Sequence, residues 1–495
     1  MIKAQDIAEA TGGTLIPLTI APGGMPDFSP AEIVFPGISI DSRTIKEGEL
    51  FLALKGDRFD GHDFVKDALK VAGGALVHRT AQCVMEALSQ EPSLHSADYD
   101  GRAAAPKVLI AVDDTLRALH DLARFLRKRF AGSVVSVVGS NGKTTTKELI
   151  CSILETRWNV LKTAGNLNNH IGMPLSMTRI SGDTDALVLE MGTNRPGDVD
   201  QLCSIGLPDI GVVTNIGYEH IEGFGSIERV RAAELEIAPY VTKLVVNADD
   251  AFLMEGVNET FKGTVVTFGI EQPEATVRAE DTVFSDEGTR FSLVARGEQI
   301  AVQLRLAGLF NVYNALAAAA AASTIGFALQ EIKAGLEAFG GVALRFEIRR
   351  IGGVTYLNDC YNANPSSMEA SVKELVRRVQ ASGPGQQGSR RAIAVLGDML
   401  ELGDFAVEAH RKLGAWMAEL PVAVVIGAGP LMAHAVAAFT GTALHEDTAE
   451  NAAAALVSIV KEGDIVLIKG SRGMRMERVL AAVEAAHRGP GRAQQ

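Results

Sequence analysis

The sequence predicts an α/β protein built from three domains, and three observations support this prediction. Its 495 residues exceed what one hydrophobic core usually organises. The composition, 47% hydrophobic and 22% charged with 50 glycines, is typical of a folded globular protein. Two long stretches of the chain also alternate short apolar runs of β type with helical segments. This alternation indicates parallel strands joined by crossover helices.

Charge and cysteine content exclude several classes of function. The formal net charge of -13 argues against a surface that binds nucleic acid. Residues 1–13 lack a basic segment followed by an apolar core, and no apolar run is long enough to span a bilayer. We therefore expect a cytoplasmic protein without a membrane segment. The four cysteines are too scattered for a disulfide framework or a zinc site, namely Cys83, Cys151, Cys203 and Cys360.

The first predicted domain covers residues 1–105. Strand-like runs at Glu32–Ile40 and Glu49–Ala53 lie between turns rich in Gly and Asp, which predicts a small α/β domain. A helix over Asp113–Phe130, with apolar positions at helical spacing, opens the second predicted domain at residues 106–343.

The second and third domains are both predicted to contain parallel sheets. Strands of the second are expected at Val134–Val138, Ala186–Met191, Ile210–Thr214 and Leu244–Asn247, followed by hairpins over Phe268–Ala301 and a helix over Asn314–Ser323. Strands of the third, residues 344–495, are expected at Ala392–Leu396, Val422–Ile426 and Asp464–Ile468. The third pattern predicts a doubly wound sheet, with a flexible loop at 381–390 and a disordered tail at 488–495.

A glycine-rich turn between a strand and a helix predicts a phosphate-binding loop. The strand Val134–Val138 runs into this turn, and a helix is expected over Thr146–Glu155. The turn itself is Gly139, Ser140, Asn141, Gly142, Lys143, Thr144 and Thr145. Backbone amides and the helix dipole bind phosphate oxygens in such turns. Lys143 is suited to the β- and γ-phosphates and the Thr144 hydroxyl to Mg²⁺.

Two polar residues follow strands that are expected to end at the same sheet edge. Glu190 ends the run Ala186–Leu189, and His220 follows the run Ile210–Thr214. Because ligands bind at the carboxyl ends of parallel strands and Mg²⁺ prefers oxygen ligands, Glu190 is a candidate metal ligand, and His220 is expected at the same edge. A solvated strand end for Glu190 and a structural role for His220 are the alternatives.

The loop and several longer stretches resemble the Mur ligase family. Val137 stands where the first Gly of the usual P-loop would lie, and the shorter loop is similar to that of Mur ligases and folylpolyglutamate synthetases. Three later stretches resemble the members that add D-alanyl-D-alanine, at Asp359–Met368, Leu396–Gly403 and Lys469–Met474. Gly37–Thr44, Phe51–Gly56 and Asp60–Phe64 resemble a UDP-sugar-binding module that the synthetases lack.

The resemblance implies a function and an architecture. It implies a small UDP-binding domain, a central P-loop ATPase-like domain and a Rossmann-like third domain. It also implies an ATP- and Mg²⁺-dependent ligase of peptidoglycan synthesis. Such an enzyme joins D-alanyl-D-alanine to UDP-N-acetylmuramoyl-tripeptide through an acyl phosphate, and we expect it to be a monomer.

The resemblance also assigns roles to residues. The implied catalytic residues are Lys143, Glu190, His220, Arg345 and Asp359. The implied nucleotide-binding residues are Gly139, Ser140, Asn141, Gly142, Lys143, Thr144, Thr145, Asn311, Asn314, Arg345 and Asp359. Ser42, Arg43, Asn168, Tyr361 and Asn362 are implied to bind substrate, and Thr144, Glu190, His220 and Glu234 to bind metal.

Two positions depart from the family pattern. Glu234 stands where Mur ligases commonly carry a carbamoylated lysine, and we hypothesise that it supplies the same negative charge directly. Its alternative is a solvent-facing helix residue. Phe310 replaces a histidine, while Asn311 and Asn314 are kept. Without the resemblance, Asn314 would be read as a cap of the Ala-rich helix.

Two other functions fit parts of the sequence. A sibling ligase would add meso-diaminopimelate or lysine to the UDP-muramoyl dipeptide, but the stretch Asn362–Pro365 disfavours it. A nucleotide-switched binding protein would need the phosphate loop alone, so Glu190 and His220 favour an enzyme instead.

Overall fold

The computed structural model describes residues 1–18, 28–88, 106–285, 287–381 and 390–488. The predicted loop at 381–390 and the tail from residue 488 fall almost entirely outside these ranges. The chain forms two compact units: the first comprises residues 1–135, 158–191 and 200–209, and the second comprises residues 136–157, 192–199 and 210–495. The predicted boundaries at 105 and 343 stay predictions. Within the described ranges, the structure has no helix with the length and apolar character that a membrane span requires.

The first unit is an α/β structure, as the sequence predicts. Its elements are β1 (Ile2–Lys3), α1 (Ala4–Thr11), β2 (Thr14–Pro17), β3 (Val34–Phe35), β4 (Ile38–Ser39), β5 (Leu50–Leu52), α2 (Val65–Ala68), β6 (Gly74–His78), α3 (Gln82–Leu88), β7 (Val108–Val112), α4 (Thr115–Arg129), β9 (Val160–Lys162), α6 (Gly172–Met177), β10 (Ala186–Glu190) and most of α7 (Asp198–Gly206). A five-stranded sheet has the order β2-β7-β6-β5-β4, and β1 pairs with β3. Both faces of the five-stranded sheet are covered by apolar clusters.

Helix α4 begins at Thr115, two residues after the predicted start. The Asp114 carboxylate accepts hydrogen bonds from the backbone N–H groups of Leu116 and Arg117, which satisfies amides that the helix leaves free. Strand β10 pairs in parallel with β9 and ends at Glu190.

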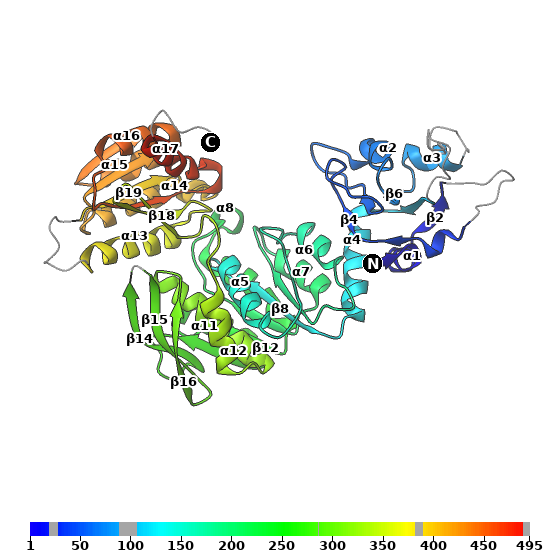
Figure 1. The fold of residues 1–495 in the computed structure, drawn as a ribbon, viewed down its shortest axis with the longest axis horizontal. Helices are drawn as coiled ribbons and strands as arrows, with labels where there is room; N and C mark the ends of the chain where they lie inside the picture. The colour runs from blue at the N-terminus through cyan, green and yellow to red at the C-terminus, as the bar shows by residue number, and fades with distance from the viewer. Residues whose placement is uncertain (19–27, 89–105, 286, 382–389, 489–495) are drawn as a thin grey trace. The chain divides into compact units, whose positions relative to one another are not determined.

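The second unit contains the phosphate loop and two sheets. Its central elements are β8 (Ser133–Val138), α5 (Lys143–Leu154), β11 (Ile210–Val213), α8 (Ile221–Phe224), α9 (Ile227–Glu234), β12 (Lys243–Asn247), α10 (Ala251–Thr260), β13 (Thr264–Gly269), β14 (Val277–Ser285), β15 (Gly288–Ala295), β16 (Glu298–Leu304), α11 (Leu309–Ile325) and α12 (Leu329–Ala338). These strands follow the order β16-β15-β14-β13-β12-β11-β8 (Figure 1). Helix α5 begins at Lys143, three positions before the predicted start, because the glycine turn itself ends there.

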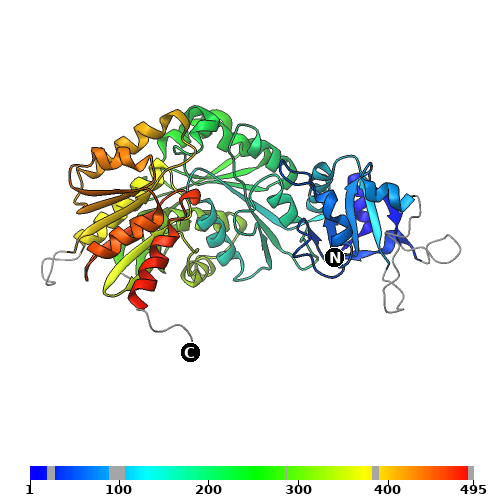
Figure 2. The same cartoon turned by 90° about the horizontal axis from the view of Figure 1, so that it is seen from above.

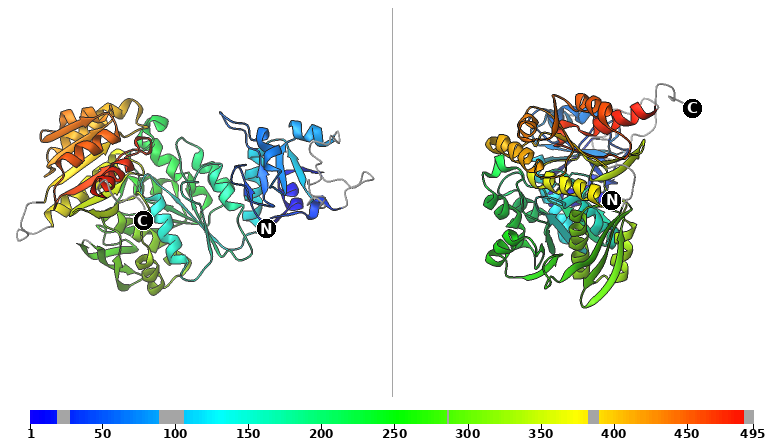
Figure 3. Two further views of the ribbon diagram at one scale, coloured as in Figure 1. Left: turned by 45° about the horizontal axis from the view of Figure 1, so that its top comes forward. Right: turned by 90° about the vertical axis from the view of Figure 1, so that its left-hand side faces the viewer.

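The predicted hairpins are confirmed, and they extend the central sheet. Strands β14, β15 and β16 pair antiparallel in sequence, while β14 joins the edge of β13 in parallel. They are the long green arrows in the right-hand view of Figure 3. Phe284, near the end of β14, lies 3.9 Å beneath the guanidinium of Arg377.

The remaining elements of the second unit form a doubly wound sheet, as predicted. They are β17 (Glu347–Ile351), β18 (Val354–Asp359), α13 (Pro365–Gln380), β19 (Ala392–Gly397), α14 (Ala406–Met417), β20 (Val424–Ala428), α15 (Met432–Ala438), β21 (Thr442–Glu446), α16 (Ala449–Ile459), β22 (Ile465–Lys469) and α17 (Glu477–Arg488). The strand order is β17-β18-β22-β19-β20-β21, with every pair parallel except β17 with β18. Helices cover both faces of this sheet (Figure 2).

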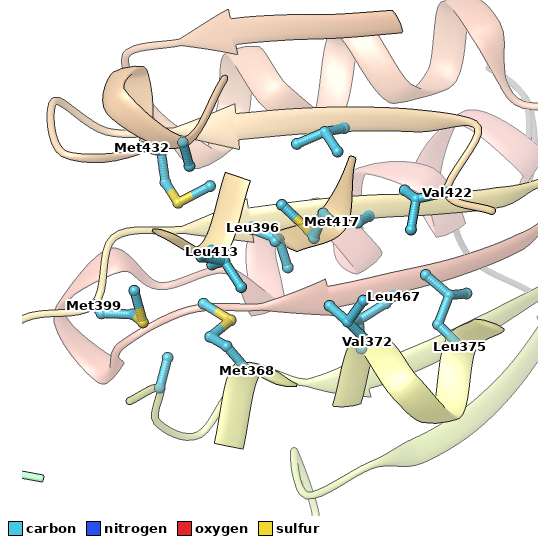
Figure 4. Packing of buried hydrophobic residues seen from close by; sticks show 14 of the residues in the cluster. Met368, Val372, Leu375, Leu396, Met399, Leu413, Met417, Val422, Met432 and Leu467 are labelled. Carbon is cyan, nitrogen blue, oxygen red and sulfur yellow. The ribbon is translucent and has the colours of Figure 1, made fainter. Parts of the chain in front are cut away.

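Helix α13 packs its apolar stripe on this sheet. Met368, Val372 and Leu375 recur at helical spacing and face Leu467 of β22 (Figure 4). All four side chains are fully buried. Because α13 follows the end of β18 directly, this packing fixes the turn between them.

We predict that Leu467→Ala lowers the free energy of unfolding by about 2–5 kcal/mol, because it leaves a cavity under α13. Chemical denaturation of the whole chain measures the change. Val457→Ala is the control, since Val457 on α16 is 41% exposed and should change stability little. Equal effects of the two substitutions would contradict the assigned packing.

Candidate active site

The turn between β8 and α5 has room only for glycine at two positions. Gly139 and Gly142 have φ angles of 117° and 83°, which side chains of L-residues rarely adopt. A Cβ on Gly139 would lie 2.3 Å from the Thr214 hydroxyl oxygen, and one on Gly142 would lie 2.2 Å from Asn314 Oδ1. The turn is therefore pressed between the end of β11 and helix α11.

Side chains from distant segments fix the backbone of this turn. Glu234 Oε2 accepts a hydrogen bond of 2.7 Å from the N–H of Gly139. The Asn141 carbonyl accepts from the Thr214 hydroxyl at 2.6 Å and from Asn215 Nδ2 at 3.0 Å. These contacts hold the turn in one conformation before any ligand binds, so the arrangement suits an anion-binding site at a helix N-terminus.

Lys143 is paired with a carboxylate that the sequence analysis did not single out. Its Nζ lies 3.2 Å from Glu219 Oε1 and donates to the Gly139 carbonyl at 2.5 Å. Glu219 and Glu234 are both buried. Burial, opposed by Lys143 and assisted by the Glu234 carboxylate, raises the pKa of Glu219 to about 8. Burial also raises the pKa of Glu234, against the opposing charge of Lys143.

Arg345 lies just before the doubly wound sheet and its helices, which are called the C-terminal fold below, and its side chain reaches the phosphate loop. Its Nη2 donates to the Thr144 hydroxyl at 3.0 Å, and its guanidinium lies 3.9 Å from the centre of the Tyr361 ring. A planar cation on an aromatic face is held in orientation as well as in place. The structure thus brings together three residues that the sequence analysis predicted for the same site.

Asp359 anchors the turn after β18. Its Oδ2 lies 2.6 Å from Lys469 Nζ and accepts a hydrogen bond from the Ser371 hydroxyl, while its Oδ1 accepts from the backbone N–H of Phe346. Lys469 also donates to the carbonyl of Asn362. Asp359 is therefore held by three protein groups, and the same lysine holds the backbone of Asn362, which is exposed.

His220 has a constrained backbone conformation and an acidic partner. Its φ angle of 47° lies in the left-handed region, which is costly for a residue with a Cβ. Its Nδ1 lies 2.6 Å from Glu401 Oε2, and the hydrogen bond from this imidazole lowers the pKa of Glu401. Glu401 comes from the C-terminal fold, between β19 and α14.

Asn311 and Asn314 line the opposite side of the loop. Asn314 Nδ2 donates to Asn311 Oδ1, and Asn314 Oδ1 accepts from the Thr146 hydroxyl. Phe310, beside them, packs edge-on against Phe346 with ring centroids 5.1 Å apart. Phe310 thus makes an apolar contact between α11 and the segment that leads into β17.

The other predicted residues belong to the first unit. Asn168 Nδ2 donates to Glu190 Oε1 at 2.9 Å, so two predicted residues lie together. The Arg43 guanidinium donates two hydrogen bonds to Asp41 and its backbone N–H donates a third, and together they lower the pKa of Asp41 to about 2. The Arg43 side chain is nevertheless 86% exposed. Ser42 lies in the same turn.

Four contributors to the site were not predicted as such. They are Glu219, Asn364, Glu401 and Lys469. Asn364, Glu401 and Lys469 lie within stretches that resemble the family, so the sequence contained a signal for these three. The contacts, however, join residues that are far apart in the sequence. Lys143 and Glu219 are 76 residues apart, and Asn141 and Asn364 are 223 residues apart. Such pairings depend on the fold and cannot be read from one sequence.

Three segments of the chain match Mur ligase domains. Residues 34–127 match the catalytic domain of the Mur ligase family, residues 137–322 the Mur ligase middle domain, and residues 344–472 the glutamate ligase domain of Mur ligases.

Curated relatives match almost end to end. The UDP-N-acetylmuramoyl-tripeptide--D-alanyl-D-alanine ligase of Bacillus subtilis is 33% identical, over 97% of this chain and 98% of the relative. The enzyme of the same name from Escherichia coli is 33% identical, over 92% of this chain and 95% of the relative.

Solved structures match the fold over the same length. A crystal structure of MurF from Acinetobacter baumannii superposes with a TM-score of 0.82 at 29% identity, covering 97% of this chain and 98% of that one. MurF ligase from Thermotoga maritima, in complex with ADP, gives a TM-score of 0.76 at 30% identity, covering 92% of this chain and 99% of that one. The chain therefore belongs to the Mur ligase family, whose members are ATP-dependent ligases that form carbon–nitrogen bonds.

Proposed function

We propose that the Lys143 loop and its neighbours carry out the reaction named for the relatives, the ATP-dependent joining of D-alanyl-D-alanine to UDP-N-acetylmuramoyl-tripeptide. The observation that carries this proposal is the 3.0 Å contact between Arg345 and Thr144. It connects a loop suited to ATP phosphates with the segment that begins the C-terminal fold. A ligase needs this connection because the activated carboxylate and the attacking amine must meet.

The chemistry follows from the poor leaving ability of oxide. An oxygen of the tripeptide carboxylate attacks the γ-phosphorus, and the bond to ADP breaks with its electron pair on ADP. The amine of D-alanyl-D-alanine then attacks the acyl carbon and loses a proton, while phosphate leaves with the C–O electron pair. Lys143 stabilises the transferring phosphoryl group electrostatically, and the loop amides orient it. No covalent intermediate with the protein is required.

We propose that side chains near the loop would hold a Mg²⁺ ion. Thr144 offers a hydroxyl, and Glu234 Oε1 is buried without a hydrogen bond to any residue that the structure describes. His220 would use Nε2, because its Nδ1 faces Glu401, an arrangement common in metal-binding histidines. When bound, Mg²⁺ would neutralise charge on the phosphate oxygens. Glu190 remains a metal ligand predicted from the sequence.

We propose that the other predicted contacts serve the two ends of the substrates. The exposed guanidinium of Arg43 and the Ser42 hydroxyl are suited to the phosphates of a UDP-sugar. Asn168 and the exposed Asn362 are suited to the peptide part of the substrates. Asn311 and Asn314 are proposed to lie near adenine, although their amides also bond to each other and to Thr146.

Phosphate release from ATP and Mg²⁺ tests the function directly. We expect release only when both UDP-N-acetylmuramoyl-tripeptide and D-alanyl-D-alanine are present, with a pentapeptide product of matching mass. Lys143→Met should lower kcat at least about 100-fold, because the transferring phosphoryl group loses its ammonium partner. Glu259→Gln, an exposed carboxylate on α10, is the control and should turn over normally. Turnover only with the dipeptide substrate and a diamino acid would identify the sibling ligase, and ATP binding without turnover a nucleotide-switched binder.

Glu234 has two competing roles that a conservative variant separates. If its carboxylate helps to bind Mg²⁺, Glu234→Gln should raise the Mg²⁺ concentration for half-maximal activity about tenfold or more, with no stimulation of the unmodified enzyme by bicarbonate. If Glu234 only supports the Gly139 amide, the amide oxygen of Gln can replace it and the Mg²⁺ dependence stays unchanged. A titration of activity against Mg²⁺ decides between the two roles.

The raised pKa of Glu219 predicts a pH-dependent stability. Between an unfolded pKa near 4.5 and the folded value of about 8, the folded chain holds a proton that the unfolded chain releases. The folded state is therefore favoured at low pH, and this contribution is lost as pH rises through that window. Between pH 6 and 8, wild type should lose about 1–2 kcal/mol of stability relative to Glu219→Gln. Thermal melts of both proteins at each pH measure the difference, and parallel pH profiles would refute the burial effect.

A further inference from the structure

Asn141, in the middle of the phosphate loop, is bonded to the start of helix α13. Its Oδ1 accepts a 3.0 Å hydrogen bond from Asn364 Nδ2, and its Nδ2 donates a 3.0 Å hydrogen bond to Ser366 Oγ. Ser366 Oγ donates in turn to Asn364 Oδ1 at 3.1 Å. The amide of Asn141 is therefore used in both directions by one short turn of the C-terminal fold.

The backbone beside this contact approaches closely. A Cβ on Gly217 would lie 2.7 Å from Ser366 Oγ and 3.3 Å from Asn141 Nδ2. The N–H of Gly217 donates to Ser140 Oγ at 2.8 Å. The segment after β11, the phosphate loop and the start of α13 thus meet at one point, with no space for a bridging side chain from Gly217.

Asn364 has a second task at the same point. Its Oδ1 accepts a 2.8 Å hydrogen bond from the N–H of Ser367, and its own N–H donates to Ser367 Oγ at 3.0 Å, so it caps α13. Only 7% of Asn364 is exposed. The cap fixes the start of α13. Because the same side chain also bonds to Asn141, it connects the position of α13 to the position of the loop.

This connection bears on the reaction, because α13 lies next to the residues that hold Arg345. Asp359 and Tyr361 precede the helix in the same turn, and Tyr361 supports the guanidinium that reaches Thr144. The Ser371 hydroxyl, within α13, donates to Asp359 Oδ2 at 2.8 Å. A shift of the helix start would therefore displace the Arg345 contact as well.

We propose that Asn364 is a positioning residue, which couples the phosphate loop through Asn141 to the part of the C-terminal fold that receives the amine substrate. The proposal rests on the proposed role of the Lys143 loop as the nucleotide phosphate site. In this role Asn364 does not contact reacting atoms. It keeps the acyl phosphate, formed at the loop, and the amine in one reactive geometry.

Asn364→Asp is the sharp test, because it is isosteric. Aspartate keeps the Oδ1 acceptor and caps helices as well as asparagine does, so the melting temperature should stay near that of wild type. The donor to Asn141 Oδ1 becomes an oxygen, which turns an attraction into a repulsion. We expect kcat/KM for D-alanyl-D-alanine to fall about tenfold or more, while the Kd for ADP, from calorimetry, changes less than about twofold.

Two further proteins show whether the loss runs through Asn141. Ser367→Ala removes the other half of the cap but no contact with the loop, and should keep kcat/KM near the wild-type value. In an Asn141→Ala background, Asn364→Asp should change kcat/KM less than about twofold, because the partner is already gone. Should Asn364→Asp fail to fold, Ser366→Ala removes the acceptor for Asn141 Nδ2 and is expected to lower kcat/KM about threefold or more.

Each result decides the question. Turnover of Asn364→Asp at the level of Ser367→Ala, or above wild type, overturns the proposal. So does a rise in the Kd for ADP that matches the loss of turnover, since Asn364 would then only support the loop. Lys143→Met separates the two levels of inference. If it binds a non-hydrolysable ATP analogue normally, the phosphate-site role fails, whereas weakened binding with a normal Asn364→Asp enzyme refutes the coupling alone.

Discussion

The lack of space around Gly139 and Gly142 is the constraint on which the rest of the second unit depends. A side chain at either position would collide with Thr214 or Asn314, so β11 and α11 can approach the loop only because these two residues lack a Cβ. Helix α5 begins directly after this loop, at Lys143. The strand order, the Ala-rich helix α11 and the buried polar contacts all serve this close packing.

One lysine and two buried carboxyl groups lie near the loop. Lys143 faces Glu219, while Glu234 accepts from a loop amide and both carboxylates are buried. Removing one member of such a set leaves an uncompensated charge in a medium of low polarity, which costs far more than the set contributes when complete. The site is therefore sensitive to single substitutions even where no substrate is contacted.

The sequence predicted the architecture well because the signals were local. Alternating apolar runs located β8, β11, β19 and β22, and the glycine turn located the start of α5 within three residues. Long-range pairings were not predictable in the same way. Glu219 was not predicted, because its contact with Lys143 depends on how the segment after β11 folds back on the loop. Asn364 lies in a stretch that resembles the family, yet only the fold reveals that it bonds to both the start of α13 and Asn141.

The contact between Phe310 and Phe346 has a thermal consequence. Two aromatic rings, packed edge-on, connect α11 to the segment before β17, whereas the contact between Asn141 and the start of α13 consists of hydrogen bonds. Stabilisation by apolar burial weakens on cooling, because its driving force near room temperature is largely entropic. The two contacts therefore respond differently to temperature. On cooling, the apolar contact weakens, and the C-terminal fold is held against the loop increasingly by hydrogen bonds.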